Sequence, residues 1–218
     1  MVMMALSGRV ARHVFSACFI VAGLLAQPLV SPASAMEVSR AVNQLYTDVS
    51  AYPPKSGAFT LCYGFQCRRR LEYAFTATDR SALASIMAGG KGSAAAERAA
   101  AQRAVVWFDK HVGPMIGTNK RVARADFRAG SDATNYDCWD TTRNTTALLL
   151  VLQDWGLFRY HTVGDPRYRG NALVGQTPHN TAILIDKATR VEWVVDLWTR
   201  GYGQTPEVMP ADEWVKLD

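Results

Sequence analysis

The stretch that decides the fold is NYDCWDTTRNTTALLLVLQDWGL, residues 135–157. It places a lone cysteine, Cys138, directly before a segment that has the pattern of an amphipathic helix. Asp137 or Asn135 supplies the side-chain acceptor that such a helix needs at its first turn. We therefore expect Cys138 to stand at a helix N-terminus, where unpaired N–H groups and the helix dipole favour a thiolate over a thiol.

Three segments that follow this helix predict β-strands, because they are rich in Val, Ile, Trp and Tyr: LFRYHTV at 157–163, HNTAILID at 179–186 and RVEWVVDLW at 190–198. The connection between the last two is short enough for a hairpin. The stretch 164–178 is rich in Gly and Pro and predicts a long loop, and loops of that length are often functional. Beyond residue 200 the tail predicts irregular structure.

Helices and a hairpin are predicted on the N-terminal side. The segment 37–52 predicts a short helix, and a second helix is expected to begin at a cap, Asp79, and to end at Gly89. An alanine-rich helix follows, with Ser93 as its cap and the pair Gly113-Pro114 as its end. Together with the strands, this order predicts an α+β protein.

The first 35 residues resemble a cleavable export signal. A short basic region precedes an apolar run at 14–26, and the small residues Ala33-Ser34-Ala35 end the segment. The run is too short for a membrane-spanning helix, so no stable membrane insertion is expected after cleavage. We predict cleavage after Ala35, which leaves residues 36–218 as a single domain, periplasmic or secreted.

The charge of the chain gives little sign of a nucleic-acid partner. The formal net charge is +5, and two of the arginines belong to the predicted leader, so residues 36–218 carry a mild excess of +3. The basic run Arg68-Arg69-Arg70 lies beside Glu72 in a strand-like segment, which favours a solvated strand edge. No nucleic-acid partner is therefore predicted.

The cysteines lead to a prediction about Cys138. Cys18 leaves with the leader, and the remaining three are Cys62, Cys67 and Cys138. Cys62 and Cys67 flank a tight turn, where two cysteines come within disulfide distance, and an oxidising compartment favours their pairing. Cys138 is then the odd cysteine, which means either a bridge between two chains or a free reactive thiol.

A reactive thiol needs a base and a group that orients the base. His111 stands near the end of the alanine-rich helix and His161 within a strand, whereas His179 opens a strand directly after the long loop. Asp196 lies inside the apolar run VEWVVDLW, where a carboxylate is costly unless it is paired. A hairpin turning at 187–190 brings His179 and Asp196 near one another, although Asp196 could instead pair with Arg200.

The motifs DCWD at 137–140, HNTAILI from His179 and VVDLW around Asp196 resemble the core of the bacterial transglutaminase-like cysteine proteinases. The resemblance covers about residues 135–198. It implies a papain-like, transglutaminase-like core in which the helix bearing Cys138 packs on an antiparallel sheet. It also implies a protease or amidase that acts on a protein or peptide through a thioester, with Cys138 as nucleophile, His179 as general base and Asp196 as orienting group.

Three residues depart from that family's pattern: Tyr136 stands where a glycine is common, Asn180 where a small residue follows the histidine, and Trp139 beside the cysteine. These departures bear on the substrate. No cofactor and no metal site is predicted, since the chain lacks HExxH and CxxC motifs and has few histidines. The competing hypothesis is an inactive periplasmic binding module, in which Cys138 is buried and inert and the aromatic strands with loop 164–178 recognise a partner.

Overall fold

The computed structural model describes residues 36–217 except 126, 127 and 129. The predicted leader and its cleavage position lie outside the described residues. The helices are α1 Arg40–Thr47, α2 Ala77–Ala88, α3 Ala94–Ile116, α4 Cys138–Asp154 and α5 Ala211–Trp214. The strands are β1 Ala58–Tyr63, β2 Arg69–Ala74, β3 His161–Arg169, β4 His179–Asp186, β5 Glu192–Asp196 and β6 Glu207–Pro210. The predicted α+β class is confirmed.

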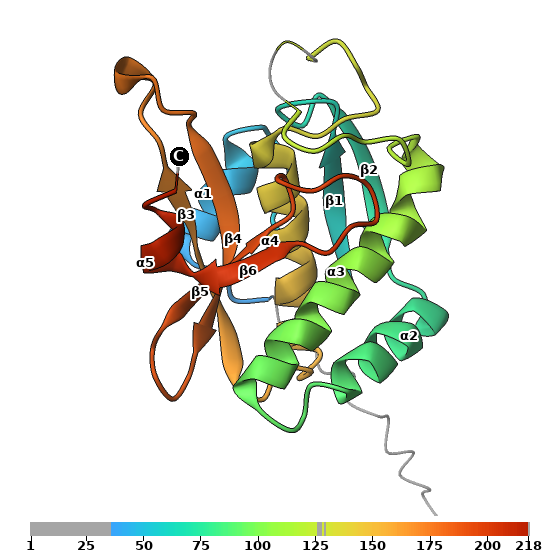
Figure 1. The fold of residues 1–218 in the computed structure, drawn as a ribbon. Coiled ribbons are helices and arrows are strands. Elements are labelled where there is room, and N and C mark those ends of the chain that lie inside the picture. Colours follow the sequence, from blue (N-terminus) through green and yellow to red (C-terminus); the bar gives the residue numbers. More distant parts are fainter. Residues whose placement is uncertain (1–35, 126–127, 129, 218) are drawn as a thin grey trace, which may run out of the picture. The chain divides into compact units, whose positions relative to one another are not determined.

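The strands form two antiparallel sheets, a hairpin of β1 and β2 and a four-stranded sheet in the order β3-β4-β5-β6 (Figure 1). Strand β4 is the most deeply buried, with seven of its eight residues inside, because it has a partner strand on each edge and helices on its faces. The predicted hairpin after β4 closes with the amide of Asp186 bonded to the carbonyl of Val191 at 2.9 Å.

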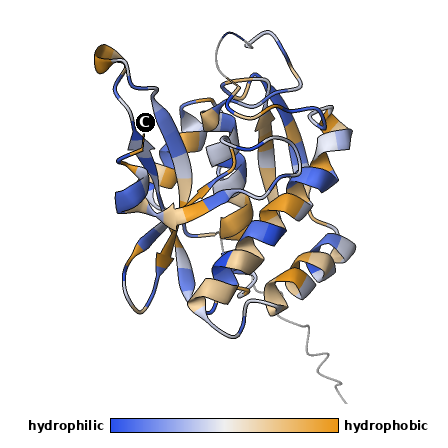
Figure 2. Cartoon of the chain, viewed as in Figure 1, coloured by the Kyte–Doolittle hydropathy of each residue, from blue (hydrophilic) through white to orange (hydrophobic). Residues whose placement is uncertain are grey.

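Helix α4 lies between the two sheets and contacts β1 on one side and β3, β4 and β5 on the other (Figure 1). Every residue from Asp140 to Leu152 is buried. Figure 2 shows that its N-terminal half is hydrophilic and its C-terminal half hydrophobic, as the sequence CWDTTRNTT followed by ALLLVLQD requires. The apolar half fills the core, and the polar half carries the buried hydrogen bonds described below.

Helix α3 runs past its predicted end at Gly113-Pro114, and Tyr202 explains why. A proline inside a helix leaves the carbonyl four residues earlier without its N–H donor. Here that carbonyl belongs to Lys110, and it accepts a hydrogen bond from the Tyr202 hydroxyl at 3.2 Å. A Cβ at Gly113 would lie 2.4 Å from the Tyr202 ring, so the glycine makes room for it. The helix instead ends at Gly117, whose φ of 77° provides a left-handed cap.

Three further predictions are wrong in detail. Thr76, not Asp79, caps α2, and Asp79 completes a capping box as the third residue of that helix. The strand expected at 157–163 is β3, which begins at His161 and runs on to Arg169, within the predicted loop. A register shift between Gly164 and Arg167 accommodates Pro166 in this edge strand. The tail is also regular, since it forms β6 and α5.

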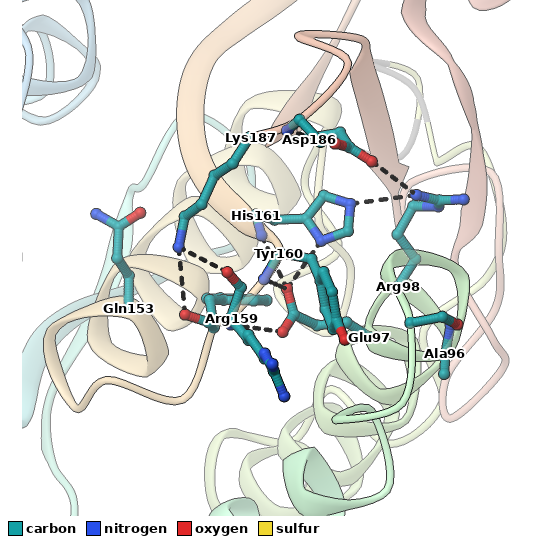
Figure 3. A network of polar contacts seen from close by, with 12 residues as sticks. Ala96, Glu97, Arg98, Gln153, Arg159, Tyr160, His161, Asp186 and Lys187 are labelled. Carbon is teal, nitrogen blue, oxygen red and sulfur yellow. Dashed lines mark hydrogen bonds and ion pairs between the residues drawn. The ribbon is translucent and has the colours of Figure 1, made fainter.

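A buried polar cluster joins α3 to the start of β3 (Figure 3). The Glu97 carboxylate accepts hydrogen bonds from the backbone amides of Arg159, Tyr160 and His161 and from Nδ1 of His161, all at 2.6–2.9 Å. Nε2 of His161 faces Nη1 of Arg98 at 3.2 Å. A guanidinium only donates, so Nε2 of His161 accepts from Arg98 and Nδ1 donates to Glu97. The cluster is a structural junction, because His161 is 0% exposed and both of its ring nitrogens have partners.

None of the helices in the described part of the chain combines the length and the apolarity that crossing a bilayer requires.

Candidate active site

Cys138 is the first residue of α4, as predicted, and Asp137 caps the helix by accepting a hydrogen bond from the amide of Asp140 at 2.7 Å. The thiol is partly exposed and unpaired. The first amides of a helix have no acceptor within the helix, and the backbone N–H of Cys138 interacts with its own sulfur at this position.

One face of α4 holds the β1–β2 connection, because Asp137, Asp140 and Asn144 recur at helical spacing. The Asp140 carboxylate accepts hydrogen bonds from the amides of Phe65 at 2.8 Å and Cys67 at 2.7 Å. Asp137 accepts from the amide of Gln66 at 2.7 Å. The Asn144 amide bonds the N–H and the C=O of Cys62 at 2.8 and 2.7 Å, as a neighbouring strand would.

The disulfide Cys62–Cys67 predicted from the cysteine count is present and closes this connection. Within it Phe65, Gln66 and Cys67 all have positive φ values, of 67°, 52° and 57°, which cost energy in residues other than glycine. The disulfide and the two aspartates hold the loop in this conformation. We call residues 62–67 the disulfide loop.

The sulfur of Cys138 is held from the sheet side. Nδ2 of Asn180, on β4, donates to Sγ of Cys138 at 3.6 Å. The hydroxyl of Thr142, one turn along α4, donates to the other end of the same amide at 2.5 Å. Thr142 therefore fixes which way the amide points and presents its N–H₂ group to the sulfur.

His179 and Asp196 are brought together, at the start of β4 and the end of β5. Nε2 of His179 lies 2.6 Å from Oδ2 of Asp196, which also accepts a hydrogen bond from Nε1 of Trp214 at 3.0 Å. Both side chains are 1% exposed. An ionised carboxylate only accepts hydrogen bonds, so Nε2 carries the proton and Nδ1 is left as the basic nitrogen. Arg200 pairs with Glu207 at 2.8 Å, so it is not the partner of Asp196.

Cys138 and His179 are not joined by a hydrogen bond. Nδ1 of His179 is buried and has no hydrogen-bond partner anywhere in residues 36–217 that the structure describes. Successive strand residues face opposite sides of a sheet. Asn180 faces α4 and the sulfur, whereas the His179 ring packs 5.3 Å from Trp214 of α5 and 4.5 Å from Trp198. The imidazole thus stands at the start of β4, one residue from the contact that holds the sulfur.

The expected thiolate is not the resting state of Cys138. Burial raises the pKa of the thiol to about 12, and the charges of Asp137 and Asp196 raise this pKa as well. The backbone N–H groups of Asn180 and of Cys138 itself lower this pKa by a smaller amount. Desolvation and nearby carboxylates outweigh the helix dipole here, so at neutral pH the thiol keeps its proton unless a base removes it.

A cleft of about 610 Å³ opens at Cys138. Its walls come from the disulfide loop, from Trp139 and Trp198, and from residues 172 and 175–178 of the segment between β3 and β4. Trp198 links the two parts of the site, since it lines this cleft and contacts the His179 ring. The end of the predicted functional loop therefore lies at the site.

The sequence did not identify two residues that hold the site. Trp214 stands in the tail that predicted irregular structure, and no pattern marks its partnership with Asp196. Asn180 stood out only as a departure from the family pattern. A polar residue on the buried face of a strand indicates such a position, because a buried polar side chain needs a hydrogen-bond partner.

The other two histidines in the described part of the chain have structural partners. His161 belongs to the Glu97 cluster described above. His111 lies 3.5 Å from Asp79 and stacks on Trp107 with 4.9 Å between ring centroids. Because α3 extends to Ile116, His111 does not lie in its last turn, and its partner is Asp79 on α2 instead.

No protein-family model, no curated protein and no solved structure matches this chain.

Proposed function

We propose that this chain is an exported cysteine hydrolase, a protease or amidase, with a papain-like, transglutaminase-like core. The observation that carries the proposal is the bond of 2.6 Å between His179 and Asp196, which leaves Nδ1 of the imidazole as an unpartnered base. His179 precedes Asn180, which contacts the sulfur of Cys138. A buried Asp–His pair next to an unpaired cysteine at a helix N-terminus is the arrangement that thiol acyl transfer needs.

In the proposed reaction Nδ1 of His179 accepts the thiol proton as Sγ of Cys138 attacks the carbonyl carbon of an amide. The backbone N–H of Cys138 stabilises the oxyanion that forms. As the C–N bond breaks, His179 returns the proton to the departing amine, and the acyl group remains on sulfur as a thioester. Water, deprotonated by His179, then releases the acid and restores the thiol. Asp196 stabilises the imidazolium in both halves of the reaction.

The raised pKa of Cys138 gives His179 a defined task. A thiol with a pKa of about 12 is almost wholly protonated at neutral pH, so it reacts only when its proton leaves during the attack. The substrate class we propose is a protein or peptide, because the cleft of about 610 Å³ is large enough for several residues of an extended chain.

Export is proposed on two grounds. The first is the leader-like segment 1–35, and the second is the disulfide Cys62–Cys67, since disulfides persist in oxidising compartments.

Iodoacetamide alkylation tests the base. At pH 7 the unaltered protein should alkylate at Cys138 roughly 100-fold faster than the His179→Ala variant, the lower end of the usual contribution of a general base. In the variant the rate should rise about tenfold with each pH unit, because only the ionised thiol reacts and its pKa stays high. Mass spectrometry of the peptide that contains Cys138 measures both rates.

The matched control is His111→Ala, which removes a histidine on α3 and should leave the alkylation rate unchanged. Equal, slow labelling of the unaltered protein and the His179→Ala variant would contradict the enzyme proposal. It would favour the inactive binding module, which agrees with the absence of a hydrogen bond between Cys138 and His179. A dimer band on a non-reducing gel would show instead that Cys138 bridges two chains.

A further inference from the structure

A second groove, of about 570 Å³, adjoins the cleft at Cys138. The two share Gln66, Arg68 and Trp139 as lining residues, so Trp139, the neighbour of the thiol, stands between them. We call the second one the arginine groove, because Arg68, Arg70 and Arg143 line it.

The three guanidinium groups have backbone partners rather than carboxylates. Arg70 donates to the carbonyls of Cys67 at 3.1 Å and Ser50 at 2.9 Å, and also to that of Val49. Arg68 donates to the carbonyl of Gly130 at 3.1 Å. Carbonyl groups satisfy N–H donors without cancelling the charge. Neither arginine forms an ion pair with any carboxylate of the described chain.

Arg143 lies deepest in the groove, at 3% exposure. Its Nε donates to the carbonyl of Leu45 at 2.6 Å, and its guanidinium lies 5.4 Å from the centre of the Trp139 ring. Nη1 is buried without a hydrogen-bond partner among the described residues. A buried cation with an unsatisfied donor is costly, and an anion bound nearby would offset part of that cost.

The carboxylates near the groove do not balance these charges. Asp48 is the one acidic residue that lines it. Asp137 and Asp140, at the start of α4, are already bonded to amides of the disulfide loop. Burial and the charge of Asp137 also raise the pKa of Asp140, which lowers its share of negative charge near neutrality. The lining of the arginine groove is therefore net positive, with three arginines against Asp48. Asp137 and Asp140 act on the deepest-buried of these arginines, Arg143, and leave the exposed Arg68 and Arg70 without an ion pair among the described residues.

We propose that the arginine groove binds the carboxylate side chain of a peptide whose backbone passes Trp139 to reach Cys138, so that this protein prefers acidic peptides. The inference rests on the proposed function for the peptide nature of the ligand. Guanidinium groups bind carboxylates through charge-assisted hydrogen bonds, and a positive groove concentrates anions. The adjoining cleft holds one arginine and one aspartate, so the preference arises in the groove.

Peptide binding to the Cys138→Ser variant tests the proposal without turnover. Two blocked pentapeptides of alanine carry Glu or Gln at the centre, so that either can slide to place that side chain in the groove. Tryptophan fluorescence reports binding, because Trp139 and Trp198 line the cleft and Trp139 also lines the groove. We expect the Glu peptide to bind about tenfold more tightly than the Gln peptide, the effect of one charge-assisted hydrogen bond.

Arg68 is the residue to alter, since it makes one backbone hydrogen bond, to Gly130, whereas Arg70 makes three and Arg143 is buried. In the Arg68→Glu variant the preference for the Glu peptide should fall to parity or below, and a Lys peptide should gain affinity. Arg69→Glu is the matched control, because Arg69 lines neither the groove nor the cleft, and it should leave the preference in place.

Equal affinity for the Glu and Gln peptides, or no binding of either, would overturn the inference. So would an equal effect of Arg68→Glu and Arg69→Glu, which would show a response to net charge alone. Failure of the enzyme proposal is read separately, from the iodoacetamide rates, so the two outcomes cannot be confused.

Discussion

Asn180 is the residue that decides how the sulfur of Cys138 is held. Its amide donates to Sγ from the strand that also carries His179, and Thr142 fixes the direction of the amide. A donor at this position stabilises negative charge on sulfur, against the burial that opposes it. The polar side chain of Asn180 is therefore part of the site.

Asn180→Asp should slow alkylation of Cys138 at pH 7 by at least about tenfold, because a carboxylate would replace the donor and raise the thiol pKa further. Iodoacetamide kinetics at the peptide level measure the change. Asn43→Asp makes the same substitution on an exposed residue of α1 and should have no effect. An unchanged rate in Asn180→Asp would mean that the amide does not act on the thiol.

At the scale of elements, α4 organises the site through its different faces. The face with Asp137, Asp140 and Asn144 holds the disulfide loop, and the face with Cys138 and Thr142 meets β4. The disulfide loop in turn lines both the cleft and the arginine groove. Its conformation therefore sets the shape of both.

Replacing the disulfide by serines, in the Cys62→Ser/Cys67→Ser variant, should lower the free energy of unfolding by about 2 kcal/mol, the loop-entropy value for so short a ring. It should also slow alkylation of Cys138, because a loosened loop no longer donates to Asp137, whose charge then opposes ionisation of the thiol more strongly. Urea unfolding and iodoacetamide kinetics measure the two effects. Dithiothreitol added to the unaltered protein should reproduce both, and an unaffected alkylation rate would show that the loop does not tune the thiol.

At the scale of the molecule, the Glu97 cluster joins α3 to the four-stranded sheet at a junction away from Cys138 (Figure 3). Four donors converge on one carboxylate. The Glu97 cluster therefore contributes to the stability of the fold and not to the reactivity of Cys138. A substitution in the cluster should change the first and leave the second unchanged.

Glu97→Gln should lower the free energy of unfolding by about 2 kcal/mol, since the amide offers one acceptor oxygen and turns an N–H₂ group toward donors. Urea unfolding measures the loss. The alkylation rate of Cys138 in the folded variant should not change, and a large change would link this junction to the site. Glu213→Gln, on an exposed residue of α5, is the matched control.

The sequence predicted the parts of this structure that depend on local pattern. Helical periodicity placed α4 at Cys138, β-propensity placed β4, and the cysteine count placed the disulfide. The helix and strand patterns depend on residues close together in the chain, and the disulfide followed from the number and spacing of the cysteines. The adjacency of His179 and Asp196 followed from one short hairpin.

The parts that were wrong depend on partners far along the chain. Helix α3 passes its proline because Tyr202 supplies a donor, and β6 forms because β5 offers it an edge. The prediction that Cys138 favours the thiolate was wrong for a related reason. The helix N-terminus is visible in the sequence, whereas the burial of the thiol and the charge of Asp196, which both raise its pKa, are not.

The contact of Tyr202 with α3 also limits how the chain can evolve. Gly113 makes space for the ring of Tyr202. Pro114 leaves the Lys110 carbonyl without a helix donor, and the Tyr202 hydroxyl bonds to that carbonyl. These three positions are therefore structurally coupled. A side chain at position 113 would displace the Tyr202 ring, and the carbonyl of Lys110 would then lose its hydrogen-bond donor. Homologous chains should therefore exchange this glycine, proline and tyrosine together or keep all three.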